Sequence, residues 1–526
     1  MKMDKGKMQH ERALAPETLI LSIIMAAAAA AICMQIIARI GITPNTSIIG
    51  AIVAMMLARM PFSSMAKFRS LERQNLVQTM TSAGGFAAAN CGLLAVGIIY
   101  LFGEPGLVIA MLIGSTIATL VGMSLVYSVF DSDLYPGDAP WPPGVATAQA
   151  IVAGDQGGQK ARRLLEGIVA GAIGTHFGLP MAGIGIVFIA NIFAMTALGV
   201  GLVIRGYSQQ LFGINLGATY IPHGFMIGAG LVSLIQAIIV IQRGSKAKKE
   251  VHTTSDKQAT RTVSPAQARR AMLLHLGLYL AGALILAIIS GIYTDMSVGT
   301  MIVWVLWAGI SALLAAILVG LAAMHSGWFP GFAITVIFLT LGLFMGFPGL
   351  PLALLSGYVA SSGPCFADMG YDLKTGWLLR GEGQDAEYEL KGRREQVIAE
   401  LIGGVVGMVM VALFMNMHFE LDMLPPVSQV FATTVQAGVE PGIVRQLVMW
   451  AIPGAILQAI GGSGRAMGIL FATGLLINNP IYGIGVLLAV IIRLIIGTEP
   501  MEIREAGLIA GDGLYGFFSA IARSFF

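Results

Sequence analysis

The feature that most constrains this chain is a succession of apolar segments, each about as long as a membrane-spanning helix. The first runs from Leu19 to Ile40, and comparable segments follow through almost the whole sequence. A helix needs about 20 apolar residues to cross a membrane, whereas a transmembrane strand needs about 10 and alternates polar with apolar residues. Because the runs are continuous, the sequence predicts an all-α, polytopic integral membrane protein.

Composition excludes several classes of function. Of the 526 residues, 56% are hydrophobic and 11% are charged, whereas a soluble protein carries about 25% charged residues. These values argue against a soluble enzyme, a disordered scaffold and a nucleic-acid binder, so we expect no nucleic-acid partner. The three cysteines, Cys33, Cys91 and Cys365, lie in apolar runs without metal-ligand spacing. We therefore predict no cofactor, no bound metal and no disulfide framework.

Basic residues suggest the orientation and the division of the chain. The N-terminal segment and the least hydrophobic stretch, Arg243 to Arg270, are both rich in lysine and arginine, which favours the cytoplasmic side for both. The first half then crosses the membrane an even number of times. We predict an N-terminal transmembrane half (residues 1–243), a cytoplasmic basic linker (244–269) and a C-terminal transmembrane half (270–526). About 14–16 transmembrane helices are expected in total.

Short or interrupted segments and a weak internal echo refine this picture. The segments Trp141–Ile151 and Leu211–Tyr220 are too short to span, and such broken segments commonly form the binding site of a transporter. Ala148–Gly174 and Trp377–Gly407 both pass through a loop with Gly, acid and Gln residues and a basic pair into a Gly-rich helix. This echo predicts two similar halves with broken or re-entrant segments, although similar membrane composition also produces such matches.

The first cluster of candidate functional residues lies between Ser361 and Trp377. Asp368, Tyr371, Asp372, Lys374 and Thr375 stand beside glycines and a proline that interrupt an apolar run. Charged groups within a membrane are costly to bury and usually mark ion or substrate pathways. The alternative is a cytoplasmic loop in which Lys374 merely follows the distribution of positive charge.

The second cluster surrounds Asp512, which lies between Gly511 and Gly513 within an apolar run, three residues before Tyr515. A lone charge at this depth costs several kcal/mol if it faces lipid, so Asp512 is expected to face the interior of the bundle. The alternative is that the glycines serve helix packing and that Asp512 pairs with a nearby arginine.

Two further clusters combine polar groups with helix breaks. Four prolines surround Tyr135 and Trp141, and Thr147 follows in the short segment; the two aromatic side chains could stack on a substrate or anchor the chain at the membrane interface. Nearer the N-terminus, Arg73, Gln74 and Asn75 lead directly into an apolar helix. A simple cytoplasmic helix cap is the alternative for this second group.

Broken helices combined with intramembrane acids favour alternating-access transport. Metalloprotease, P-loop and hydrolase motifs are absent from the sequence, so we expect no enzymatic activity. The alternative function is a passive channel or facilitator for small polar solutes, since Gly-rich broken helices also build selectivity filters.

These four clusters, in this order, resemble the oligopeptide transporter (OPT) superfamily, especially its yellow-stripe-like metal-chelate branch. Residues 372–376, Asp-Leu-Lys-Thr-Gly, are similar to the family's acid-Phe-Lys-Thr-Gly-Tyr signature, and Gly507–Tyr515 is the second strong match. Arg73-Gln74-Asn75 and the Tyr-Pro and Pro-Gly-Val-Ala-Thr-Ala motifs at 135–136 and 143–148 complete the resemblance. Trp377 replaces the signature tyrosine, which makes plant substrate specificity a poor guide.

The resemblance implies a proton-coupled symporter of small oligopeptides or metal–chelate complexes. The compact chain suggests a prokaryotic member in the cytoplasmic (inner) membrane, with membrane lipid as its surroundings and a homodimer as one open oligomeric state. Under this hypothesis the proton-coupling residues are Asp368, Asp372 and Asp512. The expected substrate-binding residues are Arg73, Gln74, Asn75, Tyr135, Trp141, Thr147, Tyr371, Lys374, Thr375 and Tyr515.

Overall fold

The computed structural model describes residues 10–40, 51, 67–156, 158–250, 261–327, 329–437, 443–462 and 465–525. Within these ranges the chain forms helices and no strand; a single isolated bridge joins Phe130 to Tyr135. The apolar residues between 46 and 60 lie almost entirely outside these ranges. The prediction of an all-α protein is confirmed.

The helices before the basic linker are α1 (Pro16–Ile40), α3 (Leu71–Phe86), the π-helical η2 (Ala87–Leu93), α4 (Leu94–Phe102), η3 (Pro105–Leu107), α5 (Val108–Val129), α6 (Pro142–Gln156), α7 (Gly158–His176), α8 (Met181–Ile189), α9 (Ile192–Phe212), η4 (Leu216–Ala218) and α10 (Ile221–Glu250). Those after it are α11 (Pro265–Ser290), η5 (Ile292–Thr294), α12 (Val298–Ser326), α13 (Gly331–Phe344), α14 (Gly349–Ala360), α15 (Pro364–Leu379), α16 (Ala386–Glu420), α17 (Pro426–Ala437), α18 (Ile443–Gly461), α19 (Met467–Leu476), α20 (Pro480–Ile496), η6 (Glu499–Met501) and α21 (Arg504–Phe525).

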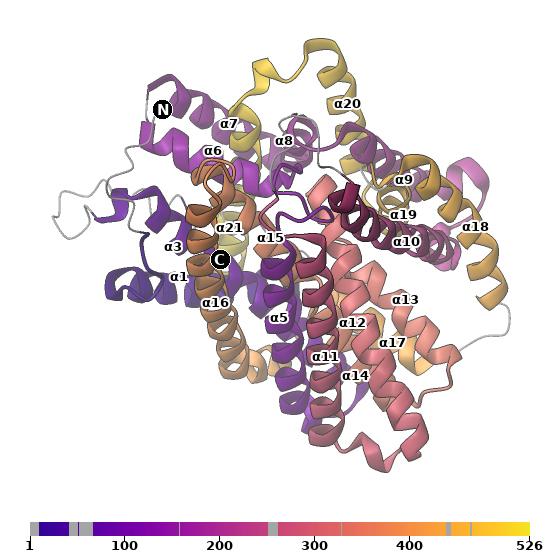
Figure 1. The fold of residues 1–526 in the computed structure, drawn as a ribbon. Coiled ribbons are helices and arrows are strands. Elements are labelled where there is room, and N and C mark those ends of the chain that lie inside the picture. The colour runs from indigo at the N-terminus through magenta and orange to yellow at the C-terminus, as the bar shows by residue number, and fades with distance from the viewer. Residues whose placement is uncertain are drawn as a thin grey trace.

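Long and short helices alternate along the chain (Figure 1). Seven helical segments among the described residues are long and apolar enough to cross a membrane, and four shorter apolar helices accompany them. The seven segments are Pro16–Ala38, Leu71–Phe102, Pro105–Val129, Pro265–Ser290, Val298–Ser326, Gly349–Leu379 and Ala386–Glu420. The structure thus confirms a polytopic helical membrane protein in which full spans are mixed with short and broken helices.

Two of these spans are interrupted at facing positions in the core. Gly349–Leu379 consists of α14 and α15, separated by a short break before Pro364, whose ring suits the first turn of a new helix. Leu71–Phe102 contains the π-helical η2, a form that is often found at functional sites. The hydroxyl of Ser361 donates to the carbonyl of Cys91 at 3.1 Å, so the two interruptions lie against each other.

Glycines bring two pairs of helices into close contact. Gly407 on α16 lies against α3, where an added Cβ would come within 2.5 Å of the Gly84 carbonyl oxygen. Gly171 on α7 lies against α21 in the same way, at 2.5 Å from the carbonyl oxygen of Leu508. Close backbone approach through small residues is a usual way for membrane helices to associate. The α3–α16 and α7–α21 pairs are therefore two places where helices of the bundle pack closely.

Both described ends of the predicted linker overlap helices. Residues 244–250 of the predicted 244–269 linker belong to α10, and α11 begins at Pro265. Thr262 binds the carboxylate of Asp131 through its amide at 3.0 Å and its hydroxyl at 2.8 Å. This end of the linker is thus held against the loop that follows α5.

Candidate functional site

Three buried acidic side chains meet between α15 and α16. Asp368 and Asp372 lie one turn apart on α15, and Glu400 faces them from α16; one oxygen of each lies within 4.8 Å of the others. Their relative exposures are 1%, 0% and 0%. Ser82 on α3 donates its hydroxyl to Asp368 at 2.7 Å. We call Asp368, Asp372 and Glu400 the acid centre.

One carboxyl group of the acid centre, that of Glu400, has no hydrogen-bond donor beside it among the described residues. One carboxyl oxygen of Asp372 and one of Glu400 lie within 4.8 Å of each other. No nitrogen or hydroxyl in the described part of the chain donates to either oxygen of Glu400. An ionised carboxylate only accepts hydrogen bonds, so two neighbouring carboxyl groups can bond to each other only when one of them carries a proton. Three negative charges this close in a buried site also cannot coexist, because desolvation and repulsion both oppose them.

Acidic groups also crowd together in proteins without holding a metal, so the spacing alone assigns no ion to the acid centre. The sequence-based prediction that the protein has no metal site stays a prediction. What the arrangement can do chemically with its own atoms is share and exchange protons between two helices.

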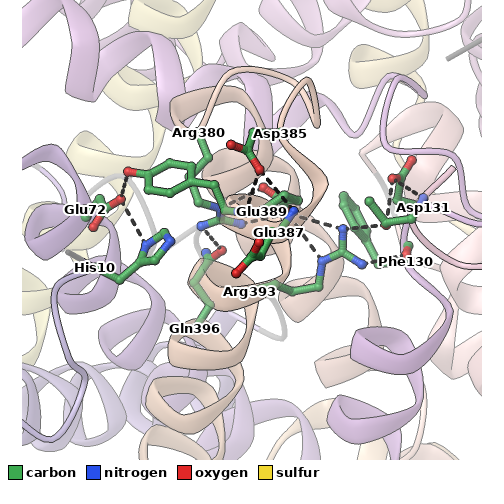
Figure 2. Close-up of polar contacts among 12 residues, drawn as sticks. His10, Glu72, Phe130, Asp131, Arg380, Asp385, Glu387, Glu389, Arg393 and Gln396 are labelled. Atoms are coloured by element: carbon green, nitrogen blue, oxygen red, sulfur yellow. Dashed lines mark hydrogen bonds and ion pairs between the residues drawn. The ribbon is translucent and has the colours of Figure 1, made fainter. Parts of the chain in front are cut away.

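A buried ion-pair network lies next to the acid centre along α16 (Figure 2). Glu389 accepts from Arg380 at 2.7 and 3.0 Å and from Arg393 at 3.2 Å. Arg393 also donates to the carbonyl of Phe130 at 3.0 Å and to the hydroxyl of Thr262 at 3.1 Å. We call Arg380, Glu389 and Arg393 the arginine network; it joins α15, α16, the end of α5 and the linker.

The residues from Asp372 to Gly376 make several separate contacts. Lys374 donates to the carbonyl of Gly137 at 2.8 Å and lies 4.5 Å above the ring of Trp377. Thr375 donates to the carbonyl of Gly144 at 3.0 Å. Asp372 thus belongs to the acid centre, whereas Lys374 and Thr375 hold α6 and the loop before it against α15.

The aromatic residues of the third cluster are buried within the bundle. Tyr135 and Trp141 both have 0% relative exposure, so neither faces the membrane interface. Tyr135 donates to the carbonyl of Ile317 at 2.8 Å, and the Trp141 ring meets Tyr371 edge-on with centroids 6.0 Å apart. The Trp141 indole nitrogen and the Tyr371 hydroxyl have no hydrogen-bond partner among the described residues. Each of these two groups can donate one hydrogen bond.

The remaining predicted residues of α3 and α6 bind within the protein. Arg73 pairs with Glu11 at 2.5 Å, and Gln74 donates to the carbonyl of Phe68 at 2.8 Å. Asn75 accepts from Gln78 at 3.0 Å, and Thr147 donates to the carbonyl of Pro143 at 2.9 Å. Arg73 therefore lies against the segment before α1, and none of these hydrogen bonds and ion pairs reaches the acid centre.

Asp512 occupies a different site, where α21 packs against α7 and α8. One of its oxygens accepts from the amide of Ala182 at 2.7 Å and the other from the hydroxyl of Thr175 at 2.9 Å. Tyr515 lies one turn further on, with its hydroxyl 2.8 Å from His176. Asp512 does face the protein interior as expected, but an amide and a hydroxyl take the place of the arginine considered from the sequence.

Sequence reasoning missed Glu400, Ser82, the arginine network and Gln396. Glu400 had a recognisable signal, because it is a lone acid within the apolar segment that follows Gln396. It was overlooked because attention went to charges beside glycine and proline breaks, whereas Glu400 lies inside an uninterrupted helix. The arginines read as loop charges, and only the fold places them inside.

Comparison with protein families agrees with this layout. Two overlapping segments, residues 14–241 and 217–523, match the family model described as OPT oligopeptide transporter protein. Together the two segments include the acid centre, the arginine network and Asp512. No curated protein matches the chain.

Proposed function

The chain belongs to the OPT oligopeptide transporter family, and we propose that it is a proton-coupled symporter of small oligopeptides in which the acid centre binds the coupled proton. The observation that carries this proposal is the meeting of three carboxyl groups in a buried site: one oxygen each of Asp368, Asp372 and Glu400 lies within 4.8 Å of the others. The family is a family of transporters, which agrees with the expectation that the protein is not an enzyme.

The proposed coupling uses repulsion between helices. With a proton between them, Asp372 and Glu400 hold α15 against α16. Loss of that proton leaves adjacent negative charges in a buried site, and the helices then separate or the site opens to water. Because α15 begins at a break in its span, it can move without distorting a continuous helix. Proton binding is thereby linked to the position of one short helix.

We place the substrate on the α6–α15 side of this helix. The unpaired donors of Trp141 and Tyr371 suit peptide carbonyl groups, and the buried Lys374 ammonium suits a terminal carboxylate. Arg73 and Asp512 are engaged elsewhere, so we assign them supporting roles rather than contacts with substrate or proton.

The finer assignments rest on the sequence resemblance. We propose transport of metal–chelate complexes as a second substrate class, membership of the yellow-stripe-like branch, and residence in a prokaryotic cytoplasmic membrane. The lysines near residues 246–249 favour the cytoplasm for the linker and the N-terminus. Homodimerisation is left to direct measurement of the oligomeric state.

Uptake into proteoliposomes tests the proposal. A pool of short peptides and a pool of metal chelates are offered with and without an inward proton gradient, to vesicles carrying the wild-type protein or Glu400→Gln. We expect the gradient to drive accumulation of peptides, a protonophore to abolish it, and Glu400→Gln to equilibrate substrate without concentrating it. Equilibration by the wild-type protein regardless of the gradient would instead identify a passive facilitator.

A further inference from the structure

The side chain of Gln396 forms hydrogen bonds both to a residue of the acid centre and to a residue of the arginine network. It lies on α16 with 0% relative exposure, and both ends of its amide are used. Its oxygen accepts from Arg380 at 2.7 Å, and its nitrogen donates to the backbone carbonyl of Asp372 at 2.7 Å and to the hydroxyl of Thr79 at 3.4 Å. Figure 2 shows Gln396 directed at the Arg380 guanidinium.

These bonds fix the spacing of the helices that carry the acids. Gln396 precedes Glu400 by four residues, so both side chains lie on the same face of α16. The bond to Asp372 holds α15 at this level, and the bond to Thr79 holds α3, which supplies Ser82 to Asp368. One amide therefore contacts all three helices that build the acid centre.

The glycine of the Asp372–Gly376 run supports this interpretation. A Cβ added at Gly376 would overlap the Gln396 oxygen and the Arg380 guanidinium. Arg380 is oriented in turn by its two bonds to Glu389. The space at Gly376 thus permits the Arg380–Gln396 bond, which is a local reason for glycine at this position.

We infer that Gln396 is a positioning residue for proton coupling: it holds the Asp372 and Glu400 carboxyl groups together and links their spacing to the arginine network. This inference rests on the proposed symport at the same site. Because the arginine network also binds Phe130 and Thr262, a change in the spacing of α15 and α16 reaches the loop after α5 and the linker through Gln396 and Arg380.

The expected direction of the effect follows from repulsion. Asp368 lies beside Asp372 and Glu400, and Cys365 on α15 lies near Glu400 and Asp368. Cys33 on α1 and Tyr371 on α15 lie near Asp368, and the Cys91 sulfur lies 3.5 Å from that of Cys365. The charged group that faces Gln396 is Arg380, which is paired in turn with Glu389. Without Gln396, the two carboxyl groups can move apart, and their mutual repulsion no longer favours retention of the proton. The pH at which uptake is half-maximal is then expected to fall.

The test is the pH dependence of gradient-driven peptide uptake by Gln396→Met, a variant that keeps the side-chain volume but forms no amide hydrogen bonds. We expect the pH of half-maximal uptake to fall by about half a unit or more. The matched control is Gln458→Met. Gln458 also has 0% exposure and a fully bonded amide, with its oxygen 3.0 Å from the Gly468 nitrogen and its own nitrogen 2.9 Å from Gln236, but it joins α18 to α10 and α19.

The outcomes separate this inference from the proposed function. A lower thermal stability in both variants with a shifted pH profile only in Gln396→Met supports it; an unchanged profile in Gln396→Met overturns it. If Gln396→Met does not fold, Gly376→Ala displaces the same amide and the same shift is required of it. If Glu400→Gln still concentrates peptide with the proton gradient, the proposed function itself fails; loss of coupling in Glu400→Gln with an unshifted Gln396→Met removes only the role of Gln396.

Discussion

Acidic side chains are buried in two contrasting ways in this protein. At the acid centre, three carboxyl groups crowd together, with one oxygen of each within 4.8 Å of the others. At Asp512, a single carboxyl group receives a donor on each oxygen, from Thr175 and from the amide of Ala182. The first arrangement brings acids against one another, whereas the second gives one acid two hydrogen-bond donors.

The donors around Asp512 tie it to the start of a neighbouring short helix. Ala182 lies in the first turn of α8, a helix of 9 residues, so Asp512 places negative charge at the N-terminal end of that helix. Arg493 places positive charge at the other end by donating to the carbonyl of Ala190 at 2.7 Å. Both ends of the α8 dipole are thus compensated by neighbouring helices. An acid within a membrane can therefore stabilise a neighbouring helix instead of taking part in transport. The hydrogen-bond donors around its carboxyl group are the feature by which we compare the two possibilities.

The largest expected difference comes from neutralising one acid at each site. Glu400→Gln should lower proton-driven accumulation about tenfold or more, because the carboxyl group beside Asp372 loses its exchangeable charge. Asp512→Asn keeps an oxygen for one donor and should reduce accumulation much less, with no change in pH dependence. Parallel uptake assays at matched protein content measure both, and equal losses would break the contrast.

Glycine substitutions should separate stability from transport. At Gly511 on α21, a methyl group would overlap the backbone carbonyl of Ile168, which cannot move away easily. Gly511→Ala should therefore cost about 1–3 kcal/mol of stability. Gly376→Ala meets the movable ends of Gln396 and Arg380, so its stability loss should be smaller while its uptake changes more. Thermal unfolding in detergent, followed by uptake, gives both quantities; a larger stability loss at Gly376 would contradict this ranking.

Two hydroxyl donors provide a finer comparison. Ser82→Ala removes the donor to Asp368, and Thr175→Val removes the donor to Asp512. Each should cost about 1 kcal/mol of stability. Only Ser82→Ala should move the pH dependence of uptake, upward, because the ionised form of Asp368 loses a hydrogen bond. A shift produced by Thr175→Val would place Asp512 in the proton pathway after all.

The smallest effect is expected outside both sites, in the loop after α5. Partial burial alone would raise the pKa of Asp138, but the hydrogen bond and charge of Arg261, at 2.6 Å, outweigh it and hold this pKa below its ordinary value. The pair therefore contributes stability above the ordinary aspartate pKa, and that contribution is lost as the pH falls through the lowered value. Asp138 is largely exposed, so Asp138→Asn should cost less than about 0.5 kcal/mol at neutral pH.

Thermal unfolding at neutral pH and near pH 3 measures this contribution. The difference between the wild-type protein and Asp138→Asn should be present at neutral pH and vanish in acid. A difference that grows on acidification would contradict the sign of the shift.

The sequence was sufficient for the fold class and for part of the acid centre. Apolar runs of helical length predicted the bundle, and the cost of burying charge pointed to Asp368 and Asp372. The same rule applied to Asp512 could not distinguish an acid that exchanges protons from one that caps a neighbouring helix. That distinction depends on Thr175 and Ala182, which are more than 300 residues away along the chain.

Contacts between distant helices were beyond sequence reasoning. The sequence suggests Lys374 as a substrate-binding residue, but it does not reveal that the ammonium group also donates to the Gly137 carbonyl, a contact made because the loop before α6 packs on α15. Arg393 reads as one of several charges at the start of a helix, yet its side chain is 1% exposed and binds Phe130. Hydropathy records how polar a residue is, but only packing determines which polar groups meet.

The central claim is that a proton crosses with the substrate through the acid centre, and proton movement measures this most directly. Proteoliposomes containing a pH-sensitive dye and no imposed gradient are given an inward gradient of a peptide that the wild-type protein transports. We expect acidification of the lumen by the wild-type protein and peptide entry without acidification by Glu400→Gln. Peptide entry without acidification by the wild-type protein, or equal acidification by both proteins, would contradict it.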